Sequence, residues 1–116
     1  MKILYVEDSP DQVGILERIV TYFGHELVVA STGEEGYAFM QKQPDLLLLD
    51  LNLPDMTGLD LARRLRAEHY TLPIVALTAD TYVYDEVQVL QAGCTVFMPK
   101  PYSVDSIKAL LDRFSR

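Results

Sequence analysis

Charged and hydroxyl-bearing side chains follow four of the short apolar runs in this sequence. Glu7 and Asp8 follow the first run, Asp50 the third, Thr78 the fourth, and Lys100 the fifth after an intervening proline. Clustered carboxylates repel one another unless a cation joins them, and Mg²⁺ takes one or two carboxylates together with waters and a phosphate oxygen. A hydroxyl and an ammonium are donors suited to the other phosphoryl oxygens. The set therefore predicts a site built around a phosphoryl group on Asp50.

The elements that must position these side chains are five strand-length apolar runs that alternate with five segments of helical periodicity. The runs cover residues 3–6, 27–30, 46–49, 74–77 and 95–98. Several are apolar at every position, which is typical of parallel strands buried on both faces. The alternation predicts a doubly wound, three-layer α/β domain with a five-stranded parallel sheet. Ligands bind outside the carboxyl ends of such a sheet, so the polar positions should converge there.

Capping residues and glycines mark the expected helix boundaries. The first helix should stop at Gly24, and the fourth should run from about residue 81 to residue 92. The other starts are marked by side chains that can accept a hydrogen bond from the first turn. These are Thr32 with Glu35 in the form of a capping box, Thr57 with Asp60 in a weaker version, and Ser103.

Composition bounds the class of protein. The chain has 116 residues, of which 49% are hydrophobic, and we expect one domain over residues 1–116. It has no apolar run of membrane-spanning length, so we expect a cytoplasmic protein without membrane insertion. A net charge of −7 disfavours direct nucleic-acid binding. The single cysteine, Cys94, excludes an internal disulfide and a cysteine-based metal cluster, and we expect it to be a small buried residue.

Four segments, in order over essentially the whole chain, resemble the signature segments of response-regulator receiver domains of two-component signal transduction. They are Val6-Glu7-Asp8, Leu49-Asp50-Leu51-Asn52-Leu53-Pro54, Ala76-Leu77-Thr78-Ala79 and Met98-Pro99-Lys100-Pro101. The resemblance implies the flavodoxin-like strand order 2-1-3-4-5, which the pattern of runs alone does not fix.

The resemblance also assigns roles around the acceptor. Asp50 would take the phosphoryl group from a phosphohistidine on a sensor histidine kinase or a histidine phosphotransfer protein. Asp8 and Asp50 would bind Mg²⁺, with Mn²⁺ as an alternative ion. Asn52 would give the metal its backbone carbonyl. Glu7 stands where the family often has a second aspartate, and it would act on the metal directly or through a water.

Further roles implied by the resemblance concern the signal. Lys100 would pair with the phosphoryl oxygens, and Thr78 would hydrogen-bond one of them after phosphorylation. Phe97, three residues before the lysine, would then rotate from exposed to buried and change the surface of the fourth helix, fifth strand and fifth helix, where a downstream protein binds. Pro101 would follow a cis peptide bond.

Two more positions are candidate partner contacts. Tyr82 and Tyr84 lie in an aromatic segment that cannot be buried at every position, so it is either an exposed partner surface or a loop that packs on itself. Ile15 lies at the edge of the first helix's apolar stripe. It is either a docking contact for the phosphodonor, as in the family, or a half-buried edge contact.

Two other classes of protein use related chemistry or folds. A haloacid-dehalogenase-like phosphatase needs a second aspartate two residues after the nucleophile, where this chain has Asn52. A flavodoxin-like small-molecule binder needs a phosphate-cradling loop where this chain has Glu7 and Asp8. We therefore favour a phosphorylation-activated switch that takes part in its own phosphoryl transfer and dephosphorylation but does not turn over external substrates.

The switch is expected to be a single-domain regulator or phosphorelay member, because Met1 directly precedes the first strand. The alternative is the receiver part of a longer regulator with an output domain beyond residue 116.

Overall fold

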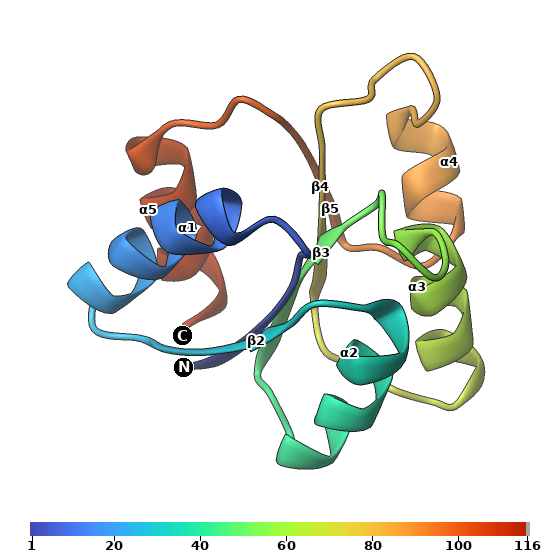
Figure 1. The fold of residues 1–116 in the computed structure, drawn as a ribbon, viewed down its shortest axis with the longest axis horizontal. Helices are drawn as coiled ribbons and strands as arrows, with labels where there is room; N and C mark the ends of the chain where they lie inside the picture. The colour runs from blue at the N-terminus through green and yellow to red at the C-terminus, as the bar shows by residue number, and fades with distance from the viewer. Residues whose placement is uncertain (116) are drawn as a thin grey trace.

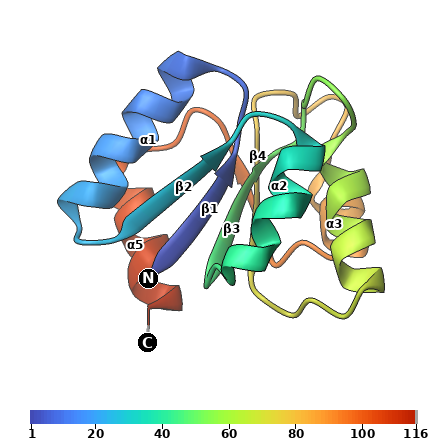
Figure 2. The same ribbon diagram turned by 60° about the horizontal axis from the view of Figure 1, so that its bottom comes forward.

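The computed structural model describes residues 1–115, which form a five-stranded parallel sheet between two layers of helices (Figure 1, Figure 2). The strands run in the order β2-β1-β3-β4-β5, and every neighbouring pair is parallel. The doubly wound fold and the strand order are thus confirmed. The strands are β1 (Lys2–Val6), β2 (Glu26–Ala30), β3 (Leu46–Asp50), β4 (Ile74–Thr78) and β5 (Val96–Pro99).

Helices α1 and α5 lie on one side of the sheet, and α2, α3 and α4 lie on the other (Figure 1). Because the strand order reverses at β1, right-handed crossovers put α1 on one face of the sheet and α2, α3 and α4 on the other. The helices are α1 (Pro10–Tyr22), α2 (Gly33–Phe39), α3 (Gly58–Ala67), α4 (Glu86–Gln91) and α5 (Val104–Phe114), with a short 3₁₀ helix η1 (Met40–Lys42) after α2.

The central strand β3 explains why its run is apolar at every position. Leu47 and Leu49 belong to the core beneath α2, α3 and α4, whereas Leu46 and Leu48 belong to the core beneath α1 and α5. All four side chains have no exposed surface. Since burying a leucine contributes about 1.5–3 kcal/mol, this strand holds the two layers together and fixes the place of Asp50 at its end.

The predicted caps Thr32, Thr57 and Ser103 are confirmed, each accepting a hydrogen bond from the backbone N–H three residues on. One detail differs: Glu35 accepts a hydrogen bond from the N–H of Ser31 rather than of Thr32, so the predicted capping box is not closed. α1 ends just before Gly24, whose φ of 85° suits a residue without a side chain.

The predicted start of the fourth helix is wrong. Residues 81–83 form a turn, and α4 begins at Glu86. The Asp80 side chain accepts a hydrogen bond from the N–H of Val83, and its carbonyl accepts one from the N–H of Tyr84. Asp85 then caps the helix through the N–H of Gln88. The turn is favoured because aromatic and β-branched residues form helix poorly, whereas aspartate bonds readily to nearby backbone.

No helix in residues 1–115 combines the length and apolar character that crossing a membrane requires.

Candidate functional site

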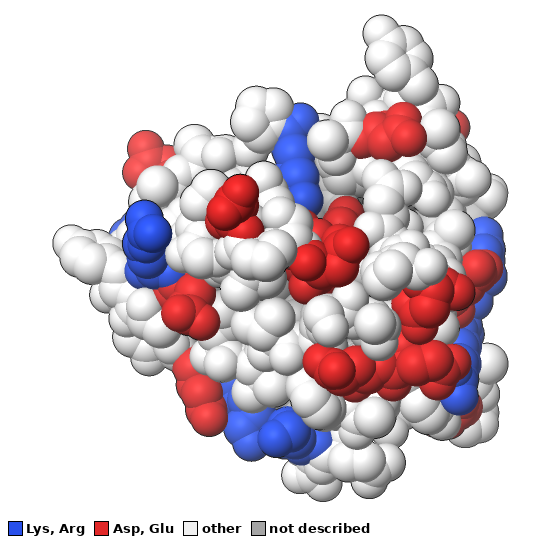
Figure 3. Space-filling view, in the orientation of Figure 1, with Lys and Arg blue, Asp and Glu red and all other residues white. Residues whose placement is uncertain are grey.

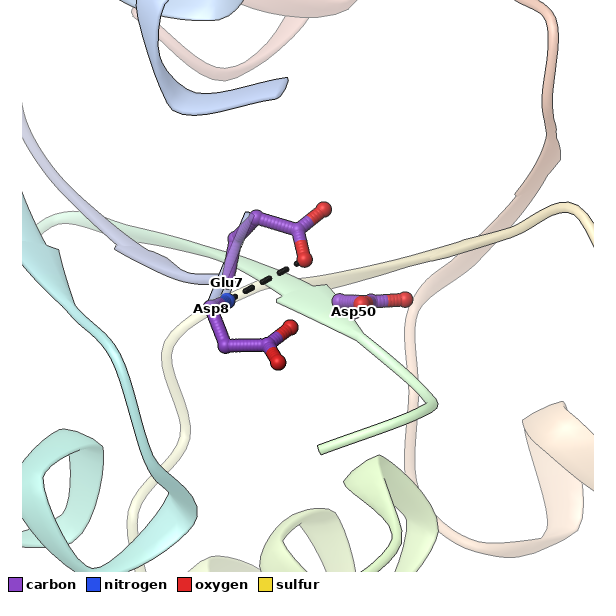
Figure 4. Close-up of side chains that lie close together, drawn as sticks. All are labelled: Glu7, Asp8 and Asp50. Carbon is purple, nitrogen blue, oxygen red and sulfur yellow. Dashed lines mark hydrogen bonds between the residues drawn. The ribbon is translucent and has the colours of Figure 1, made fainter. Parts of the chain in front are cut away.

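The strand register brings three carboxylates together where β1 and β3 end (Figure 4). Glu7 and Asp8 follow β1 directly, and Asp50 is the last residue of β3. Each offers one carboxylate oxygen, and these oxygens lie within 4.8 Å of one another. On the face of the molecule that Figure 3 draws, acidic atoms gather near the centre and a stretch of basic atoms lies beside them. The sequence prediction that these acids converge is therefore confirmed.

Glu7 is almost completely buried and is held at both carboxylate oxygens. Its Oε2 accepts a hydrogen bond from the Asp8 N–H at 3.1 Å (Figure 4). Its Oε1 accepts one from the Tyr5 hydroxyl at 3.2 Å and one from Lys100 Nζ at 3.0 Å. Lys100 Nζ is farther from Asp50, at 4.0 Å from Oδ1. The lysine thus reaches the acids as expected, but its shorter contact is with Glu7.

The electrostatics of the pocket show an excess of negative charge. Burial, and then the neighbouring Glu7, raise the pKa of Asp50 to about 7, against the opposing effect of Lys100. Burial also acts to raise the pKa of Glu7, but hydrogen bonds from Asp50 and Lys100 bring it below its usual value. Without a cation Asp50 is therefore only partly ionised at neutral pH, because two close carboxylates do not both ionise easily.

This donor set fits a hard divalent cation. All three acids offer oxygen ligands, and the raised pKa of Asp50 marks a place where a second positive charge would relieve repulsion. Asp8 is exposed, so an ion can reach the group from solvent while keeping some of its waters.

The loop after Asp50 is held tightly against the site. The Asn52 N–H donates to Asp50 Oδ1 at 3.4 Å, and Asn52 forms an antiparallel bridge with Thr57. At Gly58, the first residue of α3, a Cβ atom would lie 2.5 Å from the Asp50 carbonyl oxygen. Glycine there lets α3 approach the end of β3 closely. Sequence reasoning missed this residue, because only the distance across the loop reveals its role.

Thr78 is fully buried at the end of β4, next to β5. Its Oγ1 accepts a hydrogen bond from the Asp80 N–H at 2.9 Å, and this bond ties the hydroxyl to the loop before α4. The expected hydrogen bond to a phosphoryl oxygen stays a prediction.

A pocket of about 310 Å³ lies beside the acids and is lined by Ile15, Lys100 and Pro101, with Gln12, Ala79 and Tyr102. Ile15 is half exposed there, which agrees with its expected place at the edge of the helix stripe. The Lys100–Pro101 peptide bond is cis, as the resemblance implied.

The remaining candidates divide between surface and core. Phe97 is partly buried and packs against the core beneath α2, α3 and α4. Tyr82 is fully exposed, but Tyr84 is only 7% exposed and belongs to that core. The prediction that Tyr84 contributes to an exposed patch is therefore wrong, since the turn at residues 81–83 points its ring inward. Cys94 is buried and free, as expected.

Comparison with known proteins gives a consistent result. The family model for the response regulator receiver domain matches residues 3–112. The transcriptional regulatory protein TrcR of Mycobacterium tuberculosis is 36% identical over 112 residues, covering 96% of this chain and 44% of that protein. The alkaline phosphatase synthesis transcriptional regulatory protein PhoP of Bacillus subtilis is 34% identical over 109 residues, covering 93% and 45%. The chain spans about half the length of the curated relatives it matches.

Solved structures agree with this. The receiver domain of the sensor histidine kinase PA1611 from Pseudomonas aeruginosa, with a magnesium ion coordinated in its active site cleft, superposes with a TM-score of 0.87 at 28% identity, covering 97% of this chain and 95% of that one. The beryllofluoride-activated N-terminal receiver domain of RstA from Klebsiella pneumoniae superposes with a TM-score of 0.88 at 28% identity, covering 100% and 99%. The chain belongs to the response regulator receiver domain family of two-component signalling.

Proposed function

We propose that Asp50 is the phosphoacceptor of this receiver and that it takes the phosphoryl group from a phosphohistidine of a sensor histidine kinase or a histidine phosphotransfer protein. The observation that carries the proposal is the meeting of Glu7, Asp8 and Asp50 with Lys100 at one edge of the sheet. Residues 1–116 act as one domain in this proposal.

In the transfer, a carboxylate oxygen of Asp50 forms the new bond to phosphorus while the bond between phosphorus and the histidine nitrogen breaks. The released imidazole nitrogen takes a proton. Asp50 needs no general base because a carboxylate that has lost its proton is already the nucleophile. Lys100 and the Thr78 hydroxyl donate hydrogen bonds to the phosphoryl oxygens.

Glu7, Asp8, Asp50 and the Asn52 carbonyl would hold Mg²⁺, or Mn²⁺ in its place. The ion, when bound, neutralises charge on the phosphoryl oxygens. The magnesium ion in the PA1611 receiver supports this choice of metal.

After phosphorylation, a conformational change at Thr78 and Phe97 would alter the surface formed by α4, β5 and α5, where a protein target would bind. Tyr82 on the turn before α4 is exposed to such a partner. Ile15, beside the pocket that Lys100 and Pro101 line, would contact the phosphodonor.

Acetyl phosphate with Mg²⁺ tests the acceptor. We expect one acid-labile phosphoryl group per chain in the wild type and none in Asp50→Asn, which keeps the shape but not the nucleophile. Asp60→Asn, in the first turn of α3 with an exposed side chain, is the matched control and should label like the wild type. Equal labelling of Asp50→Asn would refute the assignment, and continuous release of phosphate without labelling would indicate a phosphatase.

A further inference from the structure

The Tyr5 hydroxyl is a buried polar group that the proposed reaction does not use. Tyr5 is the last but one residue of β1 and has no exposed surface. Its ring packs in the core beneath α1 and α5 with residues such as Leu16 and Ile107. A buried hydroxyl is costly unless it has a partner, and this one donates to Glu7 Oε1 at 3.2 Å. Residues 5 and 7 can meet because alternate residues of a strand share a face.

Lys100 donates to that same oxygen, at 3.0 Å. In the unphosphorylated protein Glu7 Oε1 therefore has two donors, one neutral and one charged. A phosphoryl group on Asp50 would compete for the charged one, because Lys100 Nζ already lies 4.0 Å from Asp50 Oδ1. When Lys100 turns toward the phosphoryl oxygens, Tyr5 is the hydrogen-bond donor that stays at Glu7 Oε1. An almost completely buried carboxylate oxygen with no donor would carry a desolvation penalty.

We propose that Tyr5 is a positioning residue that holds the Glu7 carboxylate in place while Lys100 passes from Glu7 to the phosphoryl group. The inference rests on the proposed function of Asp50 and Lys100 and adds a residue to it. In this proposal Tyr5 acts on the site through Glu7, although its side chain also interacts with that of Tyr102.

Tyr5→Phe tests the inference, because it removes the hydroxyl and leaves the buried ring. The probe is beryllofluoride, a mimic of the phosphoryl group, titrated at saturating Mg²⁺ and followed by NMR. We expect beryllofluoride to bind Tyr5→Phe about tenfold more weakly than wild type, the effect of one hydrogen bond to a charged group. Mg²⁺ alone should bind both proteins equally, since Lys100 still holds Glu7 before the mimic arrives. Tyr22→Phe is the matched control, because Tyr22 is 82% exposed on α1 and should affect neither affinity.

A second comparison uses the Lys100→Met background. This variant has no lysine at position 100, so Glu7 loses no hydrogen bond when the mimic binds. Here Tyr5→Phe should change the affinity for beryllofluoride by less than about twofold, because the two residues act through one oxygen and their effects are not additive. A role of Tyr5 in packing alone would give the same loss in both backgrounds.

Three results would overturn the inference: equal binding of beryllofluoride by wild type and Tyr5→Phe, a parallel loss of Mg²⁺ affinity, or an undiminished loss in the Lys100→Met background. Failure of the proposed function looks different. In that case the wild type itself would not bind beryllofluoride, or Asp50→Asn would bind it as well as the wild type does.

Discussion

The proton on Asp50 makes the stability of the metal-free protein depend on pH. The pKa of Asp50 in the folded protein is about 7, against an ordinary value of 3.8. Between these values the folded chain binds a proton that the unfolded chain has lost, so folding is favoured at low pH and loses this contribution as pH rises through 7. Glu7 adds no slope above about pH 5.5, because its pKa is shifted downward and it is ionised in both states.

The magnitude follows from the size of the shift. Only the folded state has the pKa near 7. Raising the pH from about 5.5 to about 8 therefore lowers the free energy of unfolding by about 2 kcal/mol. Asp50→Asn has no such proton. The free energy of unfolding of the wild type should therefore fall by about 2 kcal/mol relative to Asp50→Asn over this pH range. His25, whose pKa is lowered by burial and by the neighbouring terminal amino group, is common to both proteins and cancels in the difference.

Urea unfolding of both proteins in EDTA, at a series of pH values, measures this difference. In saturating Mg²⁺ the difference in free energy of unfolding between the two proteins should no longer depend on pH. The bound ion then balances the negative charge that the proton balances in the metal-free protein. If the two metal-free proteins keep a constant difference across the pH range, the carboxylates do not share a proton and the account of the pocket's electrostatics is wrong.

The other predictions concern single positions around the site. Asp8→Asn should weaken Mg²⁺ binding because a carboxylate ligand is lost, and a Mg²⁺ titration with the exposed Asp11→Asn as control would show unchanged affinity if Asp8 is no ligand. Gly58→Ala should lower the free energy of unfolding by about 1–3 kcal/mol, as measured by urea, because its Cβ meets the Asp50 carbonyl, and an unchanged midpoint would contradict that close approach. Thr78→Ala should still accept the phosphoryl group but respond only in part, since one hydrogen bond supplies about 1.5–3 of the roughly 5.5 kcal/mol that a near-complete switch needs. Beryllofluoride-induced NMR shifts at Phe97 as large as those of the wild type would mean that the signal takes another route.

Much of the fold could be predicted because local patterns and the sheet's geometry agree. The leucines of β3 are apolar on both faces because both faces are covered, and the acids at strand ends meet because parallel strands end at one edge.

The predictions failed where several local choices compete. Around α4, Asp80 and Asp85 can each accept backbone hydrogen bonds, and the chain uses both, first for a turn and then for a helix cap. The sequence pattern could not choose between a long helix and this turn. The burial of Tyr84 depends on that choice and was missed with it.

The sequence pattern also could not predict which residues far apart in the chain contact one another. The spacing predicted that Lys100 reaches the acids, but not that it pairs with Glu7 in preference to Asp50. The hydrogen bond from Tyr5 to Glu7 did have a local signal, because Glu7 directly follows a buried strand and lies two residues after Tyr5, on the same face.

The position of the phosphoryl group is the most direct test of the central claim. Protein labelled by acetyl phosphate with Mg²⁺ can be reduced with borohydride, which converts a phosphorylated aspartate to homoserine, and then be digested and sequenced by mass spectrometry. We predict homoserine at position 50 and at no other acidic residue. Homoserine at position 8, or a phosphoryl group on any residue other than Asp50, would contradict the account.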